Sequence, residues 1–223
     1  HSQFFQLDLK PQHHSLVLVV HLQHTIFLKE QLLYQKVGMG SSRRWMSFSY
    51  PAPRALAEIT NLPLLELEDA KSVKAIWEGH HKEQNTCVAG TLSGAQYDLL
   101  ESRAASSPFF VFPVPRDGGH FILLSQAQGK HFLFTFLEDY KNNPETATPY
   151  FSLTMYDDFK ETKDLVLARG DISDMMKRSE AQRIMEFTTS FYLDNYEAVE
   201  AFNHTPEKFD FAAHVDECLG NKS

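Results

Sequence analysis

Short apolar runs alternate with turn-forming residues over residues 109–172. The first run spans 109–116 and is followed by a turn at 117–119, and two further runs lie on either side of a second turn at 128–130. Runs rich in Phe, Val, Ile and Thr that are separated by Gly, Asp, Asn and Pro are typical of consecutive antiparallel strands. We therefore expect this stretch to form the central sheet.

The segment that precedes the sheet has the period of an amphipathic helix over 72–81. Residues at positions i, i+3, i+4 and i+7 share one helical face, and here they are Val73, Ile76, Trp77 and His80. A short strand is expected over 87–92. A second helix over 94–105 should follow Ser93, because a serine hydroxyl can accept a hydrogen bond from the first helical turn.

The C-terminal part is predicted to be mainly helical. A long amphipathic helix begins at Asp174 or Ser179 and ends near Tyr192, and a shorter one follows over 195–202. Residues 209–211 form either a short edge strand or the start of a last helix. Together these patterns predict an α+β fold, a single domain in which several helices pack on a mainly antiparallel sheet.

Charge is distributed unevenly along the chain. Residues 1–56 carry six basic and two acidic side chains, so residues 57–223 carry 15 basic and 27 acidic ones, a net charge of −12. An acidic body repels phosphate backbones, which disfavours a nucleic-acid partner but not a neutral or basic protein. The two cysteines, Cys87 and Cys218, are too few for a disulfide framework and are expected to be free thiols.

The first part of the chain is predicted to be a leader, residues 1–53, that is unstructured. From Met39 onward it is rich in Arg and Ser and has no acidic residue before Glu58. This composition is typical of an organellar transit peptide that starts at Met39, although an ordinary basic tail is the alternative. The apolar run 16–28 is too short and too polar to cross a bilayer, so no membrane insertion is expected. The folded domain is placed at 54–219.

The chemistry-bearing side chains do not form a recognisable catalytic or metal-binding motif. His80 and His81 are adjacent and lack the H-x-x-x-H spacing that brings two imidazoles to one zinc ion. We predict no metal, no cofactor and no catalytic residue. A small-molecule enzyme that uses Asp157, Asp158 and His120 in a cleft at the sheet edge remains an alternative.

Two prolines and two arginines distinguish the ends of the apolar strands. Pro113 and Pro115 cannot donate to a sheet ladder, so their strand lies at an edge or leaves the sheet. Arg116 and Arg169 each follow an apolar run, and each either pairs with an acidic residue of this chain or faces a partner. The unbroken 109–112 run is either buried on both faces or exposed to a partner on one.

Several segments, taken in order, resemble those of one protein family. The sequence FFVFPVPR at 109–116 resembles the family's F-x-x-P-L-P-R strand, with Val114 where Leu is usual. The segments 134–141, 149–159 and 162–171 are similar to the strands and the helix that follow. The family is a mitochondrial chaperone, the assembly factor that binds the β subunit of the F-type ATP synthase, and the resemblance covers roughly 54–217.

The resemblance implies a protein-binding function in the mitochondrial matrix. A monomeric chaperone would bind the unassembled β subunit and keep it soluble until the α subunit replaces it, with no ATP hydrolysis and no cofactor. A permanent structural subunit of the synthase is a further alternative. From their positions in the matching segments, the following residues are expected to contact the β subunit: Phe110, Pro113, Pro115, Arg116, Tyr156, Asp157 and Arg169.

Overall fold

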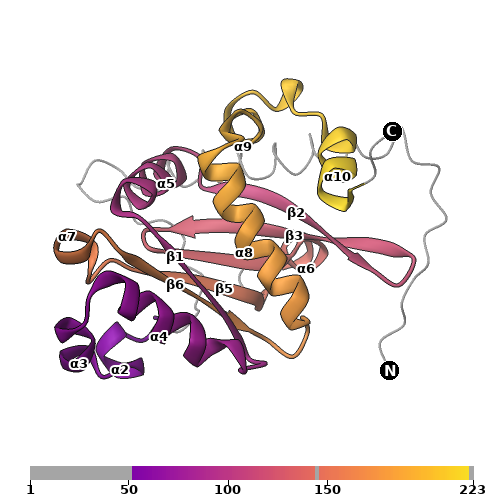
Figure 1. Ribbon diagram of the computed structural model, residues 1–223. Coiled ribbons are helices and arrows are strands. Elements are labelled where there is room, and N and C mark those ends of the chain that lie inside the picture. The colour runs from indigo at the N-terminus through magenta and orange to yellow at the C-terminus, as the bar shows by residue number, and fades with distance from the viewer. Residues whose placement is uncertain (1–51, 144–145, 221–223) are drawn as a thin grey trace, which may run out of the picture.

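The computed structural model describes residues 52–143 and 146–220. Within these ranges six strands form one antiparallel sheet, and helices pack on both of its faces (Figure 1). The α+β fold predicted from the hydrophobic pattern is confirmed. The predicted leader from Met39 lies outside the described residues, apart from residues 52 and 53.

The elements follow the predicted order. The N-terminal elements are α2 (Leu56–Ile59), α3 (Leu62–Leu67), α4 (Ala70–Lys82), β1 (Cys87–Leu92) and α5 (Gly94–Ser106). The sheet segment consists of β2 (Phe109–Arg116), β3 (Gly119–Gln128), β4 (His131–Phe136), α6 (Leu137–Asn142), β5 (Pro149–Tyr156), α7 (Lys160–Lys163) and β6 (Val166–Ile172). The C-terminal elements are α8 (Arg178–Leu193), α9 (Tyr196–His204), η1 (Pro206–Lys208) and α10 (Phe211–Leu219).

The sheet is a meander with one additional strand at an edge. Its order is β1-β6-β5-β4-β3-β2, so the strands from β2 to β6 are consecutive neighbours and β1 pairs with β6. Helix α5 carries the chain from β1, at one edge, to β2, at the opposite edge. The hairpin turns at 117–119 and 128–130 place Asp117, Gly118 and Gly129 at positive φ, as tight turns between antiparallel strands require.

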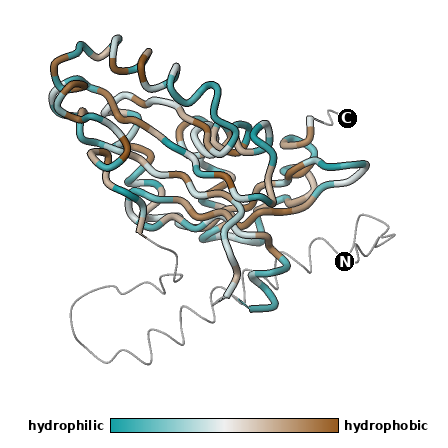
Figure 2. The backbone as a smooth tube through the Cα atoms, turned by 90° about the horizontal axis from the view of Figure 1, so that it is seen from below, coloured by the Kyte–Doolittle hydropathy of each residue, from teal (hydrophilic) through white to brown (hydrophobic). Residues whose placement is uncertain are grey.

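The larger core lies between one face of the sheet and helices α5, α8, α9 and α10, with α8 crossing that face in Figure 1. Residues Phe109–Phe112 are each at most 7% exposed, so this run is buried and not presented to solvent. The rings of Phe110 and Phe191 are 5.1 Å apart, in an edge-to-face arrangement. In Figure 2 the apolar segments run mainly along the strands, while hydrophilic and hydrophobic residues alternate along the helical turns.

The smaller core lies on the other face, where α2, α3 and α4 cover β5 and β6. Trp77 is 2% exposed, and its Nε1 donates to the carbonyl of Ala168 on β6 at 3.1 Å. The predicted apolar face of α4 is wrong in part, because Ile76 is 48% exposed and His80 is exposed, whereas His81 is buried. The face of α4 that packs on the sheet contains Val73, Trp77 and His81. The buried face is therefore rotated slightly about the helix axis from the predicted one.

The C-terminal helices resolve the ambiguity at 209–211. Asp210 Oδ1 accepts from the Ala213 N–H at 3.0 Å, so this segment caps α10 and is not an edge strand. Cys218 on α10 and Cys87 on β1 are buried free thiols, as predicted. Because β1 and β2 are the two edges of the sheet and α10 packs against β2, the two cysteines lie too far apart for a disulfide.

Candidate protein-binding surface

The outer edge of β2 is closed at its N-terminal half by side chains of α9 and α10. The Asn203 amide accepts from the Phe109 N–H at 3.1 Å and donates to the Phe109 carbonyl at 2.6 Å. The His214 Nε2 donates to the carbonyl of Val111 at 2.9 Å. Because alternate residues of a strand direct their backbone groups to the same side, these contacts occupy positions that an added strand would need.

The C-terminal half of the same edge lacks donors. Pro113 and Pro115 occupy the next two outward positions after Val111, and proline has no N–H. Of the two alternatives predicted from these prolines, an edge position or a path out of the sheet, the edge position is present, since β2 is the last strand of the sheet. A partner strand could not form a regular ladder here, so this half of the edge offers carbonyl acceptors only.

Arg116, at the end of β2, is held by Glu180 in the first turn of α8. Its Nε and Nη2 donate to the two carboxylate oxygens at 3.0 and 2.6 Å, and Nη2 also donates to the carbonyl of Met175. Burial alone would raise the pKa of Glu180, but hydrogen bonds from Arg116 and from the Lys177 N–H outweigh it and hold this pKa below its ordinary value. Of the two alternatives for Arg116, the internal ion pair is therefore present.

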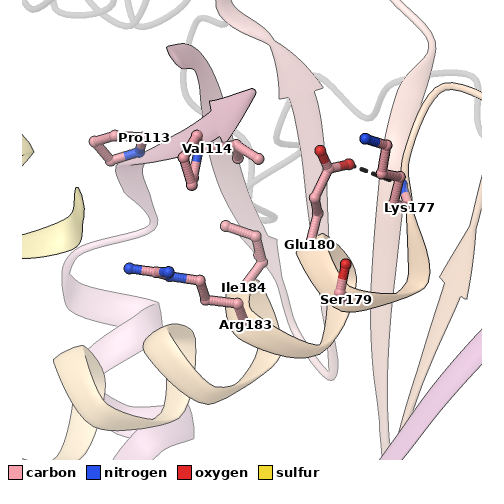
Figure 3. Close-up of a pocket in the computed structure, with 8 residues that line it drawn as sticks. Pro113, Val114, Lys177, Ser179, Glu180, Arg183 and Ile184 are labelled. Carbon is pink, nitrogen blue, oxygen red and sulfur yellow. Dashed lines mark hydrogen bonds between the residues drawn. The ribbon is translucent and has the colours of Figure 1, made fainter. Parts of the chain in front are cut away.

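A shallow groove lies between this strand end and the first turns of α8 (Figure 3). Its volume of about 240 Å³ is below the roughly 300–1,000 Å³ of pockets for small molecules and suits one or two side chains. The groove is lined by Pro113, Val114, Pro115, Lys177, Ser179, Glu180, Arg183 and Ile184. It therefore contains two of the predicted interface residues and the acidic partner of a third.

Arg169 lies on β6, away from this groove. Its Nη2 forms an ion pair with Asp171 at 2.8 Å, and it lies opposite Thr154 on β5. The Arg169 side chain is 11% exposed, and its Nε is buried without a hydrogen-bond partner in the described part of the chain. Here too the internal ion pair is present.

Tyr156 and Asp157 lie at the end of β5. Tyr156 is 6% exposed, and its ring is 6.1 Å from that of Trp77, so it belongs to the smaller core. Asp157 accepts from Lys130 Nζ at 2.5 Å in a partly exposed ion pair at the β3–β4 turn. Of these two residues, Tyr156 therefore belongs to the internal packing, and Asp157 is the one that is partly exposed.

The structure separates the predicted interface residues into two groups. Pro113, Pro115 and Arg116 lie together at the groove, while Phe110, on the same strand, is 0% exposed and supports it from within. The second group, on β5 and β6, is separated from β2 by strands β3 and β4. At about 4.8 Å per strand, the two groups are roughly 14 Å or more apart.

The family of the chain follows from its match to a known domain. Residues 36–214 match the model of the family described as ATP11 protein. The chain belongs to the ATP11 protein family. The family resemblance derived from 54–217 is thereby confirmed, and the match begins before Met39, so it also includes the basic segment that was interpreted as a transit peptide.

The ATP11 chain is similar to curated proteins named "ATP synthase mitochondrial F1 complex assembly factor 1". The protein of Danio rerio is 26% identical over 169 residues, which are 74% of this chain and 56% of the relative. That of Homo sapiens is 28% identical over 169 residues, 74% of this chain and 51% of the relative. That of Mus musculus is 27% identical over 177 residues, which are 77% of this chain and 54% of the relative. The chain spans about half the length of the curated relatives it matches.

The three residues of the enzyme alternative are not brought together in this ATP11 domain. His120 is exposed near the start of β3, whereas Asp157 is bonded to Lys130, just beyond the other end of that strand. A strand of this length separates its ends by about 30 Å. The proposed sheet-edge cleft that would join His120 to Asp157 and Asp158 is therefore not formed.

Two further properties of residues 52–143 and 146–220 bear on the class of site. Among them, no three or more His, Cys, Asp or Glu side chains are grouped so that they could hold a metal ion. None of the helices in the same ranges has the length and apolar character needed to span a bilayer.

Sequence reasoning missed Glu180, Lys177, Arg183 and Asn203. A glutamate in the first turn of a helix is a recognisable signal, because it accepts hydrogen bonds from free N–H groups there. Its pairing with Arg116, 64 residues earlier, leaves no trace in the local pattern. Asn203 similarly closes a strand 94 residues away.

Proposed function

We propose that this chain is an assembly factor for the F1 part of the mitochondrial ATP synthase and that it binds the unassembled β subunit. It would keep that subunit soluble until the α subunit takes its place. Membership of the ATP11 family carries this proposal, together with three relatives named as F1 assembly factors that align over about three quarters of the chain. The choice of the β subunit rests on the family resemblance.

The geometry supports binding as the function of the β2 edge. Arg116 ties the strand end to α8, and the outward backbone of this end offers acceptors without donors. A groove for one or two side chains lies beside it. We place the main contact with the β subunit at Pro113, Pro115 and Arg116, with Phe110 supporting the strand from the core. We place a secondary contact at Tyr156, Asp157 and Arg169.

The site of action follows from the same proposal. The chain would act as a monomer in the mitochondrial matrix, reached through a transit peptide that begins at Met39. Sequencing the N-terminus of the protein isolated from mitochondria tests this placement. A mature protein that retains residues upstream of Met39 would contradict it.

The function is tested with unassembled β subunit. The subunit is diluted from denaturant with and without an equimolar amount of the chain, and aggregation is followed by light scattering. We expect the chain to suppress aggregation, and later addition of the α subunit to release it, as seen by size-exclusion chromatography. Aggregation that is unaffected would contradict the chaperone function. Co-purification of the chain with finished F1 would instead indicate a structural subunit.

The placement of the contact is tested by replacing one arginine in each group. Arg116→Gln and Arg169→Gln are compared with the unchanged chain for binding to the β subunit, after circular dichroism shows that each variant is folded. We expect the Arg116 variant to lose more affinity than the Arg169 variant. If both bind as tightly as the unchanged chain, the assignment of the interface is wrong.

A further inference from the structure

The groove beside β2 has a charge opposite to that of the body around it. Residues 57–223 carry a net charge of −12, yet Lys177 and Arg183 line the groove and Glu180 is its one acidic lining residue. The charge of Glu180 is matched by Arg116. Within the described residues, neither Lys177 nor Arg183 forms an ion pair, so the groove has an excess of positive charge.

Arg183 has a donor that is not used within the described chain. Its Nη2 donates to the carbonyl of Cys218 at the end of α10, and its guanidinium lies 5.0 Å from the ring of Phe187. Its Nε, however, is buried and has no partner among the described residues. Figure 3 shows the side chain extending along the groove on the side of Pro113. A buried donor without an acceptor is costly, and the positive charge of this guanidinium is not paired with a carboxylate of the described residues.

The first turn of α8 adds to this field. The helix spans Arg178–Leu193, and its N-cap residue is Lys177, whose side chain cannot accept a hydrogen bond. Glu180 accepts the N–H of Lys177, but the following N–H groups of the first turn receive no side-chain cap in the described structure. Free N–H groups at the N-terminus of a helix of this length favour an anion.

We infer that the groove binds a carboxylate side chain from an acidic segment of the partner polypeptide. The carboxylate would pair with Lys177 beside the first turn of α8, and Arg183, at the other end of the groove, would add to the positive charge. A segment that inserts one side chain into the groove fits better than a segment that pairs with β2 as an added strand. The β2 edge at Pro113 and Pro115 has no N–H donors for such a ladder. In a body that is otherwise acidic, a confined positive groove selects one acidic segment and sets its register. This inference rests on the proposed function for the identity of the partner.

The test uses the whole chain and two probes, octaglutamate peptide and the unassembled β subunit. Lys177→Glu reverses a charge in the groove, and Lys82→Glu makes the same change on α4, on the other face of the sheet, where Lys82 is exposed. Binding of each probe is measured by fluorescence anisotropy or calorimetry at two salt concentrations. We expect Lys177→Glu to weaken both by about tenfold and Lys82→Glu to leave both nearly unchanged. Octaglutamate should compete with the β subunit, and octalysine should not.

The outcomes separate this inference from the proposed function. If the β subunit binds but neither Lys177→Glu nor octaglutamate affects it, the inference is overturned and the proposed function stands. If the β subunit does not bind, the proposed function fails, and titration of octaglutamate alone decides on the groove. Octaglutamate binding that is lost in Lys177→Glu but kept in Lys82→Glu supports the groove, whereas equal or absent binding overturns it.

Discussion

Glu180 joins the end of the edge strand to the first turn of α8, because one carboxylate accepts from the Arg116 guanidinium and from the Lys177 N–H. The side chain of Glu180 is 9% exposed and that of Arg116 is 28% exposed. The acid is thus the more buried partner, and its charge depends on the arginine. Removing the arginine should therefore cost more than removing a surface ion pair.

The first prediction concerns this pair. Arg116→Met should lower the free energy of unfolding by roughly 2 kcal/mol, because the carboxylate is left nearly buried with one remaining donor. The double variant Arg116→Met/Glu180→Gln should lose less than the sum of the two single losses. Urea unfolding at neutral pH measures all four proteins. Strictly additive losses would show that the two side chains are not coupled.

His214 is the second residue whose ionisation is tied to the edge strand. Burial among Phe110, Phe191 and Phe209 lowers the pKa of His214 to about 4, although its hydrogen bond to the carbonyl of Val111 opposes the shift. The unfolded chain, with an ordinary histidine pKa of about 6.5, takes up the proton first as the pH falls.

The second prediction is the resulting pH dependence. The contribution of neutral His214 is complete above about pH 6.5 and is lost as the pH falls toward 4, with a total of about 3 kcal/mol. His214→Gln keeps a donor for Val111 and should reduce the difference in unfolding free energy between pH 7 and pH 4.5. His80→Gln, at an exposed position of α4, serves as the control and should keep the difference seen in the unchanged chain. An unchanged difference in the His214 variant would contradict the prediction.

At the scale of the element, β6 packs between β1 and β5 with a glycine at position 170, where an added Cβ does not fit. A Cβ there would lie 2.3 Å from the ring carbons of Phe151 and 2.8 Å from Cγ2 of Val88. Neither neighbour can move far, since both belong to the larger core. By contrast, a Cβ at Gly79 in α4 would meet no atom within 4 Å.

The third prediction compares these two glycines. Gly170→Ala should destabilise the protein by roughly 2–3 kcal/mol, because the added methyl group forces Phe151 out of its packed position. Gly79→Ala should stabilise it by about 0.5–1 kcal/mol, since alanine has the higher helix propensity. Thermal and urea unfolding give both values. A Gly170→Ala variant as stable as the unchanged chain would show that the core around Phe151 is loosely packed.

At the scale of the whole molecule, the two thiols lie near opposite edges of the sheet. Cys87 on β1 is 0% exposed, and Cys218 on α10 is 1% exposed. Burial raises the pKa of Cys218 to about 12, which keeps it as an unreactive thiol. Helix α10 is the last described element and packs on the β2 edge, whereas β1 is covered by α4 and α8.

The fourth prediction concerns the order in which the two buried thiols become accessible to a reagent. Single-cysteine variants, Cys87→Ser and Cys218→Ser, are treated with a thiol reagent under native conditions. Cys218 should react sooner than Cys87, because α10 packs mainly on β2, whereas β1 is paired with β6 and covered by α4 and α8, so α10 should open locally at a lower free energy. Equal rates for the two thiols would mean that the sheet and α10 open only together. Reaction in denaturant serves as the control for intrinsic reactivity.

The sequence by itself determined most of the local structure of this protein. The apolar runs and turn residues of 109–172 predict the meander, because side-chain alternation and positive-φ turns are local properties. Pro113 and Pro115 limited β2 to an edge or to a path out of the sheet for the same reason, since a missing N–H is a property of the residue alone. The segment motifs also identified the family, which the match over 36–214 confirmed.

Only the tertiary structure decided which surfaces meet. It turned His81 of α4 inward and left Ile76 in solvent, because the position of the helix against β6 sets its buried stripe. It paired Arg116 with Glu180 and separated the predicted interface into two groups, since strand order and helix docking relate residues that are far apart in the chain. The positive groove at β2 is of this kind. Lys177 and Arg183 line a groove only because α8 packs beside Pro113 and Pro115. The periodicity of a segment predicts which of its residues share a face, but not which other element that face contacts.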